Sequence, residues 1–222
     1  MENKSNEEMM KALAAQLRQP SGDAALEVGE KMNAVNLLIN LDTIEALELS
    51  PNDNVLEIGM GNGFFVKNIV SVDDSIRYSG CDFSNEMVEE SYKQNAEFIQ
   101  SGQVQFQLSN AENLPYDDAI FDKVFTINTI YFWEDAQKVL SEIRRVLKEN
   151  GQFVLSIRPK SSMDQFPFAK YGFESFSSED ASELLSANGF KIVDVIEKDE
   201  EDVIFFGERL KNEFVIVKAV KS

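Results

Sequence analysis

The sequence predicts an α/β fold in which helices cover both faces of a mostly parallel, doubly wound sheet. From residue 54 onward, short apolar runs alternate with stretches of helical periodicity, which is the order of elements in such a sheet. The apolar runs are short and continuous, as expected for parallel strands that are buried on both faces. The last two β-rich runs have no helix between them. They therefore predict a terminal antiparallel pair.

The elements are assigned in chain order from periodicity and from turn-forming residues. We expect helices over 7–18, 23–34, 35–47, 64–71, 84–100, 134–148 and 178–187. We expect strands over 54–58, 76–81, 104–108, 121–127, 152–158, 191–197 and 213–220. Pro20 and Gly22 separate the first two helices, and Gly151 has the residue type suited to end the helix over 134–148.

Composition limits the kinds of chemistry that are available. The 222 residues are sufficient for one domain with a terminal extension. The formal net charge of -18 disfavours binding to nucleic acid. No histidine is present and Cys81 is the single cysteine, which excludes a histidine-based triad, a cysteine-cluster zinc site and an intrachain disulfide. With no apolar run of membrane-spanning length, we expect a cytoplasmic protein that does not bind membranes.

A glycine-rich loop directly follows the first apolar strand. The stretch 54–63 ends a strand in Glu57 and then places Gly59, Gly61 and Gly63 on alternate positions. Glycines at such a turn let a ligand approach bare backbone, and ligands bind at this edge of an open α/β sheet. The spacing differs from the Gly-x-Gly-x-x-Gly of dinucleotide sites. A carboxylate beside the loop would repel a pyrophosphate and attract an ammonium group.

An acid followed by Gly-x-Gly-x-Gly resembles the first motif of the class I S-adenosylmethionine-dependent methyltransferases. The stretch 110–116 resembles the Asp-Ala-x-x-Leu-Pro-Phe segment of small-molecule members, including the ubiquinone/menaquinone-biosynthesis type, except that Asn110 replaces aspartate and Tyr116 replaces phenylalanine. The resemblance implies a Rossmann-like, seven-stranded sheet over residues 35–222, with a terminal antiparallel hairpin and an N-terminal helical cap over 1–34. It also implies S-adenosyl-L-methionine as cofactor and S-adenosyl-L-homocysteine as product.

The resemblance also assigns roles in cofactor binding. Asp82, at the end of the second strand, would accept hydrogen bonds from the ribose hydroxyls, and Phe83 would flank the adenine. Asn128 would lie at the methionine end of the cofactor. The residues that would read the adenine edge are Asn110, Ala111 and Glu112.

Sequence motifs define the acceptor site less closely than the cofactor site. By the same resemblance, Tyr131, Phe132 and Trp133 would line it under the cap formed by residues 1–34. Tyr131 and Glu30 are the candidates for a general base, if the acceptor needs one. Because the donor motifs all begin after residue 54, we expect removal of residues 7–34 to abolish methyl transfer and to loosen acceptor binding, but to leave much of the cofactor affinity.

The function that these motifs predict is methyl transfer to a small, partly apolar or aromatic molecule by in-line displacement. Two alternatives remain: a non-catalytic S-adenosylmethionine-binding protein on the same fold, and a nicotinamide-dependent oxidoreductase. The acidic run over 197–202 is interpreted as a solvated loop without a chemical role.

Overall fold

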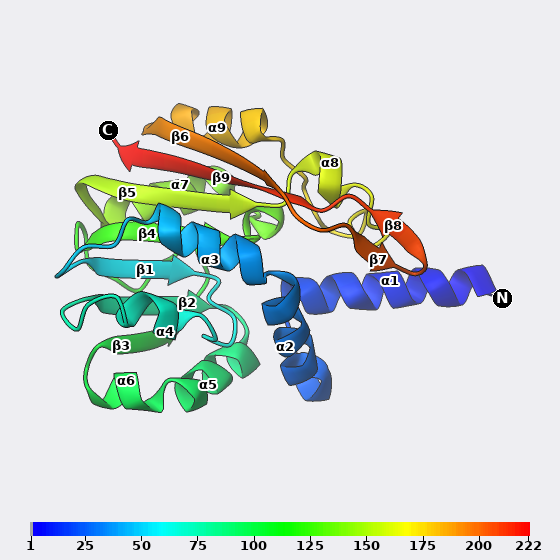
Figure 1. Cartoon of the computed structure of the whole chain (residues 1–222), viewed down its shortest axis with the longest axis horizontal. Coiled ribbons are helices and arrows are strands. Elements are labelled where there is room, and N and C mark those ends of the chain that lie inside the picture. The colour runs from blue at the N-terminus through cyan, green and yellow to red at the C-terminus, as the bar shows by residue number, and fades with distance from the viewer. Residues whose placement is uncertain (1) are drawn as a thin grey trace.

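The computed structural model describes residues 2–222, and a seven-stranded sheet forms its centre (Figure 1). The strand order is β3-β2-β1-β4-β5-β9-β6. The strands are β1 (Asn54–Ile58), β2 (Arg77–Asp82), β3 (Val104–Leu108), β4 (Phe121–Ile127), β5 (Leu147–Ile157), β6 (Phe190–Asp199) and β9 (Glu213–Lys221). The first five run parallel, and β9 pairs antiparallel with both β5 and β6. The predicted seven-stranded, mostly parallel sheet is therefore confirmed.

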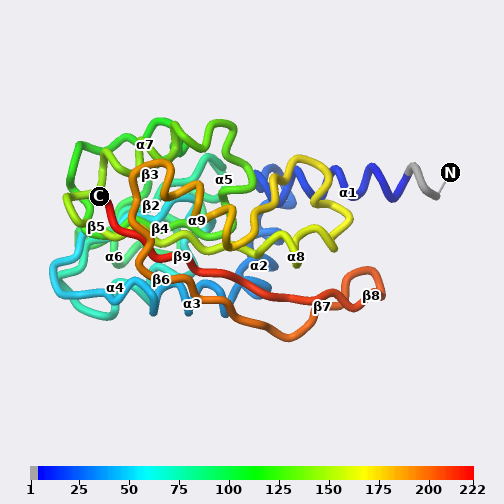
Figure 2. The backbone as a smooth tube through the Cα atoms, turned by 90° about the horizontal axis from the view of Figure 1, so that it is seen from above, coloured from blue at the N-terminus to red at the C-terminus, as the bar shows by residue number. Residues whose placement is uncertain are grey.

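Helices cover both faces of this sheet. They are α1 (Glu2–Arg18), α2 (Ala25–Val35), α3 (Leu37–Ala46), α4 (Val66–Val70), α5 (Asn85–Gln94), α6 (Ala96–Gln100), α7 (Ala136–Val146), α8 (Lys160–Met163) and α9 (Ser178–Ala187), with 3-10 turns η1 (Gly22–Ala24) and η2 (Ile130–Phe132). Seen from above, α7 lies on one side of the strands and α3 and α4 lie on the other (Figure 2).

Alternation along the central strands explains why both faces need cover. Leu56 and Leu155 belong to the core that α7 and α9 close, whereas Val55 and Val154 belong to the core that α3 and α4 close. All four side chains are fully buried. Consecutive residues of a strand point to opposite faces, so a strand buried on both sides is apolar at consecutive positions.

The boundary between α7 and β5 differs from the prediction of a helix over 134–148. Helix α7 ends at Val146, and Leu147 is already extended (φ -71°, ψ 136°) and pairs with Phe121. The residues that we expected to end the helix form an irregularity inside β5, where Asn150 has φ 60°. Gly151 is not a helix cap; a Cβ there would lie 2.8 Å from Leu147 Cδ2, so the bulge packs too closely for a side chain.

The predicted helix over 84–100 is interrupted at Asn95. Its backbone (φ -114°, ψ 23°) leaves the helical region between α5 and α6. The Asn95 side-chain amide donates to the carbonyl oxygens of Ser91 and Gly63, each at 3.0 Å. The break therefore holds the end of α5 against the glycine loop.

Helix α1 extends beyond the sheet (Figure 1), and the ammonium of its Lys11 lies 5.3 Å from the centroid of the Tyr171 ring. Strands β7 (Val203–Phe205) and β8 (Glu208–Leu210) form a small hairpin. The hairpin lies within the connection between β6 and β9, where no helix was expected, and none forms there. Among residues 2–222, no helix combines the length and apolarity needed to cross a membrane.

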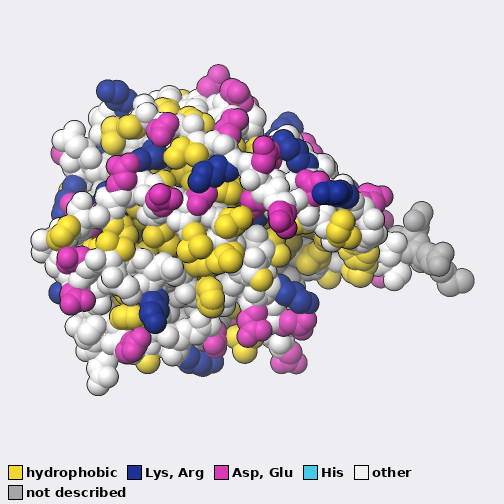
Figure 3. Space-filling view, in the orientation of Figure 1, with side chains coloured by type: hydrophobic (Ala, Val, Ile, Leu, Met, Phe, Trp, Pro, Cys, Tyr) yellow, Lys and Arg dark blue, Asp and Glu magenta, His cyan; other side chains and the backbone are white. Residues whose placement is uncertain are grey.

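Helix α3 carries hydrophobic residues on both of its sides. Ile39 is fully buried against the sheet, whereas Leu37, Leu38 and Leu41 are exposed. Figure 3, in the same orientation as Figure 1, shows hydrophobic side chains gathered over the part of the surface where α3 lies. This distribution explains why the sequence of α3 shows no single apolar stripe.

Candidate functional site

A cavity lies at the carboxyl ends of β1, β2 and β4, and the segment from the end of α1 to α3 contributes to its wall. The glycine loop, the β2–α5 connection, residues 109–112 and the segment after β4 form the remainder. Strand β1 pairs with β2 on one side and with β4 on the other, so the strand order reverses direction at this point. Open α/β sheets bind ligands at such a switch point.

The glycine loop exposes its backbone to this cavity. Gly59 and Gly61 have φ values of 77° and 57°, in the left-handed region that favours glycine. A Cβ on Gly59 would lie 2.4 Å from Thr129 Cγ2, so close packing against the segment after β4 requires glycine there. A Cβ on Gly61 would meet nothing within 4 Å. Gly61 therefore leaves open space beside the loop, in which a ligand can contact the backbone.

Gly63, which we expected to bind the cofactor, does not line the cavity. A Cβ there would lie 2.8 Å from Asn95 Nδ2 and 3.0 Å from Ser91 Cβ. The third glycine thus serves the packing of the loop against α5, and the structure gives it no direct contact with the cavity.

Asp82 connects the glycine loop to the second strand. Its Oδ2 accepts a hydrogen bond from the Gly61 N–H at 3.0 Å, and its Oδ1 accepts one from the Ser84 N–H at 2.8 Å. Burial raises the pKa of this carboxyl, and the backbone donors oppose that effect. A carboxylate offers about four acceptor sites, so two bonds to the backbone leave capacity for a ligand in the cavity.

Glu57 also lines the cavity but is almost completely buried. Its Oε2 accepts a hydrogen bond from the Tyr78 hydroxyl at 2.5 Å. Burial raises the pKa of Glu57 to about 7; the bond from Tyr78 opposes this, and the neighbouring Asp82 adds to it. The negative charge that we expected beside the loop is therefore only partly present at neutral pH.

This raised pKa predicts that Glu57 makes the ligand-free protein less stable as pH rises. Folded Glu57 keeps its proton up to about pH 7, whereas in the unfolded chain the carboxyl loses it near its ordinary pKa of 4.5. The stabilisation is full below pH 4.5 and is lost as pH rises through 7, and its size is on the order of 3 kcal/mol. Denaturant unfolding at pH 5 and pH 8 should show a smaller pH dependence in Glu57→Gln than in wild type. Equal pH dependence in both proteins would contradict the assignment.

The segment predicted to read the adenine lines the same cavity, together with Phe83. Phe83 is exposed, with 38% of its surface accessible. The Oδ1 of Asn110 accepts a hydrogen bond from the Glu112 N–H at 3.0 Å, and Glu112 forms an ion pair with Lys138 at 3.2 Å. One hydrogen bond to the side-chain oxygen of Asn110 is therefore made within its own turn, and the second lone pair of that oxygen is left for a ligand.

Asn128 lines the cavity just after β4 and adopts a left-handed backbone (φ 56°). Its Oδ1 accepts a hydrogen bond from the Arg158 N–H at 3.1 Å, and its Nδ2 donates to Asn36 Oδ1 at 3.3 Å. Phe132 and Trp133 also line the cavity, as predicted for two of the three aromatic residues. The segment after β4 thus brings one amide and two aromatic rings to the same wall.

The structure does not bring Tyr131 or Glu30 to the cavity. Tyr131 is buried, and its hydroxyl lies 2.6 Å from the Arg158 N–H, which donates to it, and 2.9 Å from the Arg158 carbonyl oxygen. Burial raises the pKa of this hydroxyl well above its ordinary value. Glu30 is exposed on α2. Neither side chain lines the cavity, so the structure gives no support to a general-base role for Tyr131 or Glu30, and that role stays a prediction.

The sequence did not predict that the segment between α1 and α2 contacts the cofactor side of the cavity. Gln19 Nε2 donates to the Phe83 carbonyl at 3.0 Å, and the Ser84 hydroxyl donates to the Pro20 carbonyl at 2.6 Å. The Gly22 N–H donates to Glu86 Oε1 at 2.8 Å. The segment that joins α1 to α2 is therefore bonded to the loop and helix that follow Asp82. That removal of the cap leaves much of the cofactor affinity stays a prediction.

The fold and the cavity together define a Rossmann-like α/β protein whose cavity lies at the switch point of the sheet. A family model described as "Methyltransferase domain" matches residues 56–155. The uncharacterized protein MJ1123 of Methanocaldococcus jannaschii is 30% identical over 76% of this chain and 80% of its own length. The matched methyltransferase domain and the relatives named as methyltransferases assign the chain to the class I S-adenosylmethionine-dependent methyltransferase family, whose cofactor is S-adenosyl-L-methionine.

Other relatives agree with this family. The O-methyltransferase cnsE of Penicillium expansum is 29% identical over 67% of this chain and 56% of its own length. A ubiquinone/menaquinone biosynthesis C-methyltransferase of Geotalea daltonii is 29% identical over 50% of this chain and 48% of its own length. The chain thus spans only about half the length of these two. A solved S-adenosylmethionine-dependent methyltransferase from Aquifex aeolicus has the same fold, with a TM-score of 0.69, 18% identity and coverage of 96% and 98% of the two chains.

Proposed function

We propose that this protein transfers a methyl group from S-adenosyl-L-methionine to a small-molecule acceptor, releasing S-adenosyl-L-homocysteine. The observation that carries the proposal is the bond between Asp82 and the backbone of Gly61 in the cavity wall. It places a buried carboxylate, with acceptor capacity left, beside a glycine with open space next to it, where a ligand can contact bare backbone. A ribose fits this pair because its two hydroxyls donate to a carboxylate.

Catalysis in this site rests on orientation. The cofactor supplies an activated methyl group, so the protein has only to align the acceptor with it and to exclude water. The two candidate general bases lie outside the cavity, and Glu57 faces Tyr78. We therefore assign no proton-transfer step to this chain's own residues, and favour an acceptor whose reacting atom is nucleophilic without deprotonation by the protein.

The acceptor we propose is small and at least partly apolar. Its support is the set of apolar side chains that line the cavity near the cap, namely Leu17, Met32, Phe132 and Trp133. Arg18 at the end of α1 forms an ion pair with Glu134 at 2.8 Å, which joins the cap over residues 1–34 to the body over 35–222. The net charge of -18 favours such an acceptor over nucleic acid. We propose the cytoplasm as its location, since the one cysteine is free and buried.

Methyl transfer from a radiolabelled donor tests this proposal. Metabolite extracts, stripped tRNA and unfolded protein should be offered separately, and label is expected only in the small-molecule fraction. Efficient labelling of RNA or protein would contradict the acceptor class. Binding of the cofactor without labelling of any fraction would favour a non-catalytic S-adenosylmethionine-binding protein.

A control with nicotinamide cofactors addresses the oxidoreductase alternative. A ligand that binds only the folded state raises the melting temperature by mass action. S-adenosyl-L-homocysteine should raise it, whereas NAD and NADP should not. Stabilisation by a dinucleotide alone would contradict the proposed cofactor.

A further inference from the structure

We propose that Arg158 is a positioning residue that orients the side chains of Asn36 and Asn128, and that Asn36 thereby donates a hydrogen bond to the carboxylate on the amino-acid arm of the cofactor. The inference rests on the proposed function. It concerns two residues, at the end of β5 and at the junction of α2 and α3, that no sequence motif marks.

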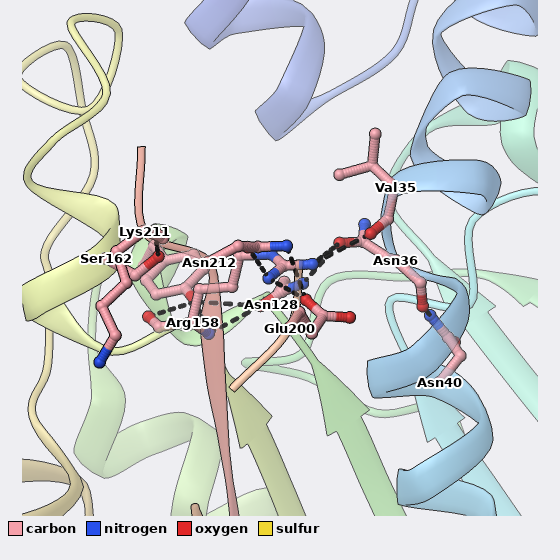
Figure 4. Close-up of polar contacts among 10 residues, drawn as sticks. Val35, Asn36, Asn40, Asn128, Arg158, Ser162, Glu200, Lys211 and Asn212 are labelled. Carbon is pink, nitrogen blue, oxygen red and sulfur yellow. Dashed lines mark hydrogen bonds and ion pairs between the residues drawn. The ribbon is translucent and has the colours of Figure 1, made fainter. Parts of the chain in front are cut away.

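Arg158 is the centre of a buried polar cluster (Figure 4). Its guanidinium bonds to Glu200 Oε2 at 2.6 Å and to Asn212 Oδ1 through one nitrogen. Through the other nitrogen it bonds to the Val35 carbonyl at 3.0 Å and to Asn36 Oδ1 at 3.4 Å. The side chains of Arg158 and Glu200 are 6% and 5% exposed. The acidic run over 197–202 was interpreted as a solvated loop, and for Glu200 this interpretation is wrong, because its side chain is buried in an ion pair with Arg158.

A buried ion pair of this kind contributes little stability by itself, because both charges lose their hydration. What it provides is a fixed geometry, since the planar guanidinium presents its donors in set directions. Arg158 thereby holds three segments of the chain together: the end of β5, the α2–α3 junction and the connections that flank the β7–β8 hairpin.

The guanidinium also determines which way the amide of Asn36 points. Arginine can only donate hydrogen bonds, so the atom of Asn36 that faces it must be the oxygen. The same oxygen accepts the bond from Asn128 Nδ2, whose own Oδ1 accepts from the Arg158 N–H. Both amides are therefore oriented by Arg158. The Asn36 NH₂ group has no hydrogen-bond partner within residues 2–222, and Asn36 lines the cavity.

The position of the Asn36 NH₂ group in the cavity indicates which group of the cofactor it binds. Asn36 contacts Asn128, the residue expected at the methionine end of the cofactor, and Asn128 and the Asp82 carboxylate lie on opposite sides of the glycine loop that follows β1. That arm carries one carboxylate, which accepts hydrogen bonds, and one ammonium, which donates them. An amide NH₂ can bond only to the first. Asn36 is thus a recognition group for the carboxylate.

Two ligands separate this role from a general effect on the fold. S-adenosyl-L-homocysteine carries the amino-acid arm, whereas 5′-methylthioadenosine keeps the adenosine and the thioether but lacks that arm. Calorimetric titration should show that Asn36→Ala lowers the affinity for S-adenosyl-L-homocysteine by about tenfold, the range of a hydrogen bond to a charged group. The affinity for 5′-methylthioadenosine should be unchanged.

Arg158→Lys tests the positioning role, because lysine keeps the charge beside Glu200 but lacks the second arm of the guanidinium. It should show the same selective loss as Asn36→Ala. Glu201→Gln is the matched control, since Glu201 is the next acid of the run and is exposed; it should alter neither affinity.

Equal losses for the two ligands, or no loss with Asn36→Ala, would overturn the recognition role. A loss with Asn36→Ala but not with a folded Arg158→Lys would overturn the positioning role. Asn36→Ala removes no core side chain, so the test stands even where Arg158→Lys fails to fold. A wild-type protein that binds neither ligand would instead overturn the proposed function.

Discussion

Asp82→Ala should weaken the binding of S-adenosyl-L-homocysteine by about 1.5–3 kcal/mol, the scale of hydrogen bonds to a charged group. The variant loses the bonds that we propose to the ribose. It also loses the two bonds from Gly61 and Ser84 that hold the glycine loop in place. Calorimetric titration measures the change, which corresponds to roughly 10- to 150-fold in the dissociation constant.

Asp117→Ala is the matched control, because Asp117 is exposed and lies outside the cavity wall. Its affinity should equal that of wild type. In contrast to Asn36→Ala, Asp82→Ala should weaken the binding of 5′-methylthioadenosine as much as that of S-adenosyl-L-homocysteine. Wild-type affinity in a folded Asp82→Ala protein would place the ribose elsewhere.

Gly61→Val should abolish measurable cofactor binding. The branched side chain would stand in the open space where we propose that the ligand meets the loop. It would also occupy a backbone with φ 57°, a left-handed conformation that costs a non-glycine residue about 1–3 kcal/mol. Titration with S-adenosyl-L-homocysteine and thermal unfolding measure the two effects separately.

Gly102→Val is the control that distinguishes the two effects of Gly61→Val, namely a side chain that fills the cavity and a strained backbone. Gly102 has φ 77°, and a Cβ there would also meet nothing within 4 Å, but it lies in an exposed turn away from the cavity. This variant should lose stability like Gly61→Val and keep its cofactor affinity. Equal affinities in the two variants would show that the cofactor does not pass beside Gly61.

The strands of the sheet are predicted well because the residue pattern within each strand is sufficient to identify it. The strands over 54–58, 104–108 and 121–127 have the predicted bounds. Residues that meet at the end of neighbouring parallel strands, such as Glu57 and Asp82, can also be placed together from the order of the elements alone. Short-range pattern and a simple topology are sufficient there.

The errors occur where a distant contact decides the structure. The break at Asn95 depends on the Gly63 carbonyl, and the buried state of Glu200 depends on Arg158, 42 residues earlier. Tyr131 has the right residue type for the cavity wall, but its hydroxyl bonds to the backbone of Arg158 instead. None of these partners leaves a periodic signal in the sequence, so pattern analysis cannot identify them.

The order of strands in the sheet has a consequence for how the protein is made. Strand β4, which pairs beside β1, is synthesised about sixty residues later, so the nascent chain carries an open β1 edge for several seconds. Strand β9 inserts between β5 and β6, so β6 has no neighbour in the sheet until residues 213–221 have been translated. Open strand edges pair readily with other chains. We therefore expect the polypeptide to carry an unpaired β6 until residues 213–221 have been translated, and this stage to be one at which pairing with another chain is possible.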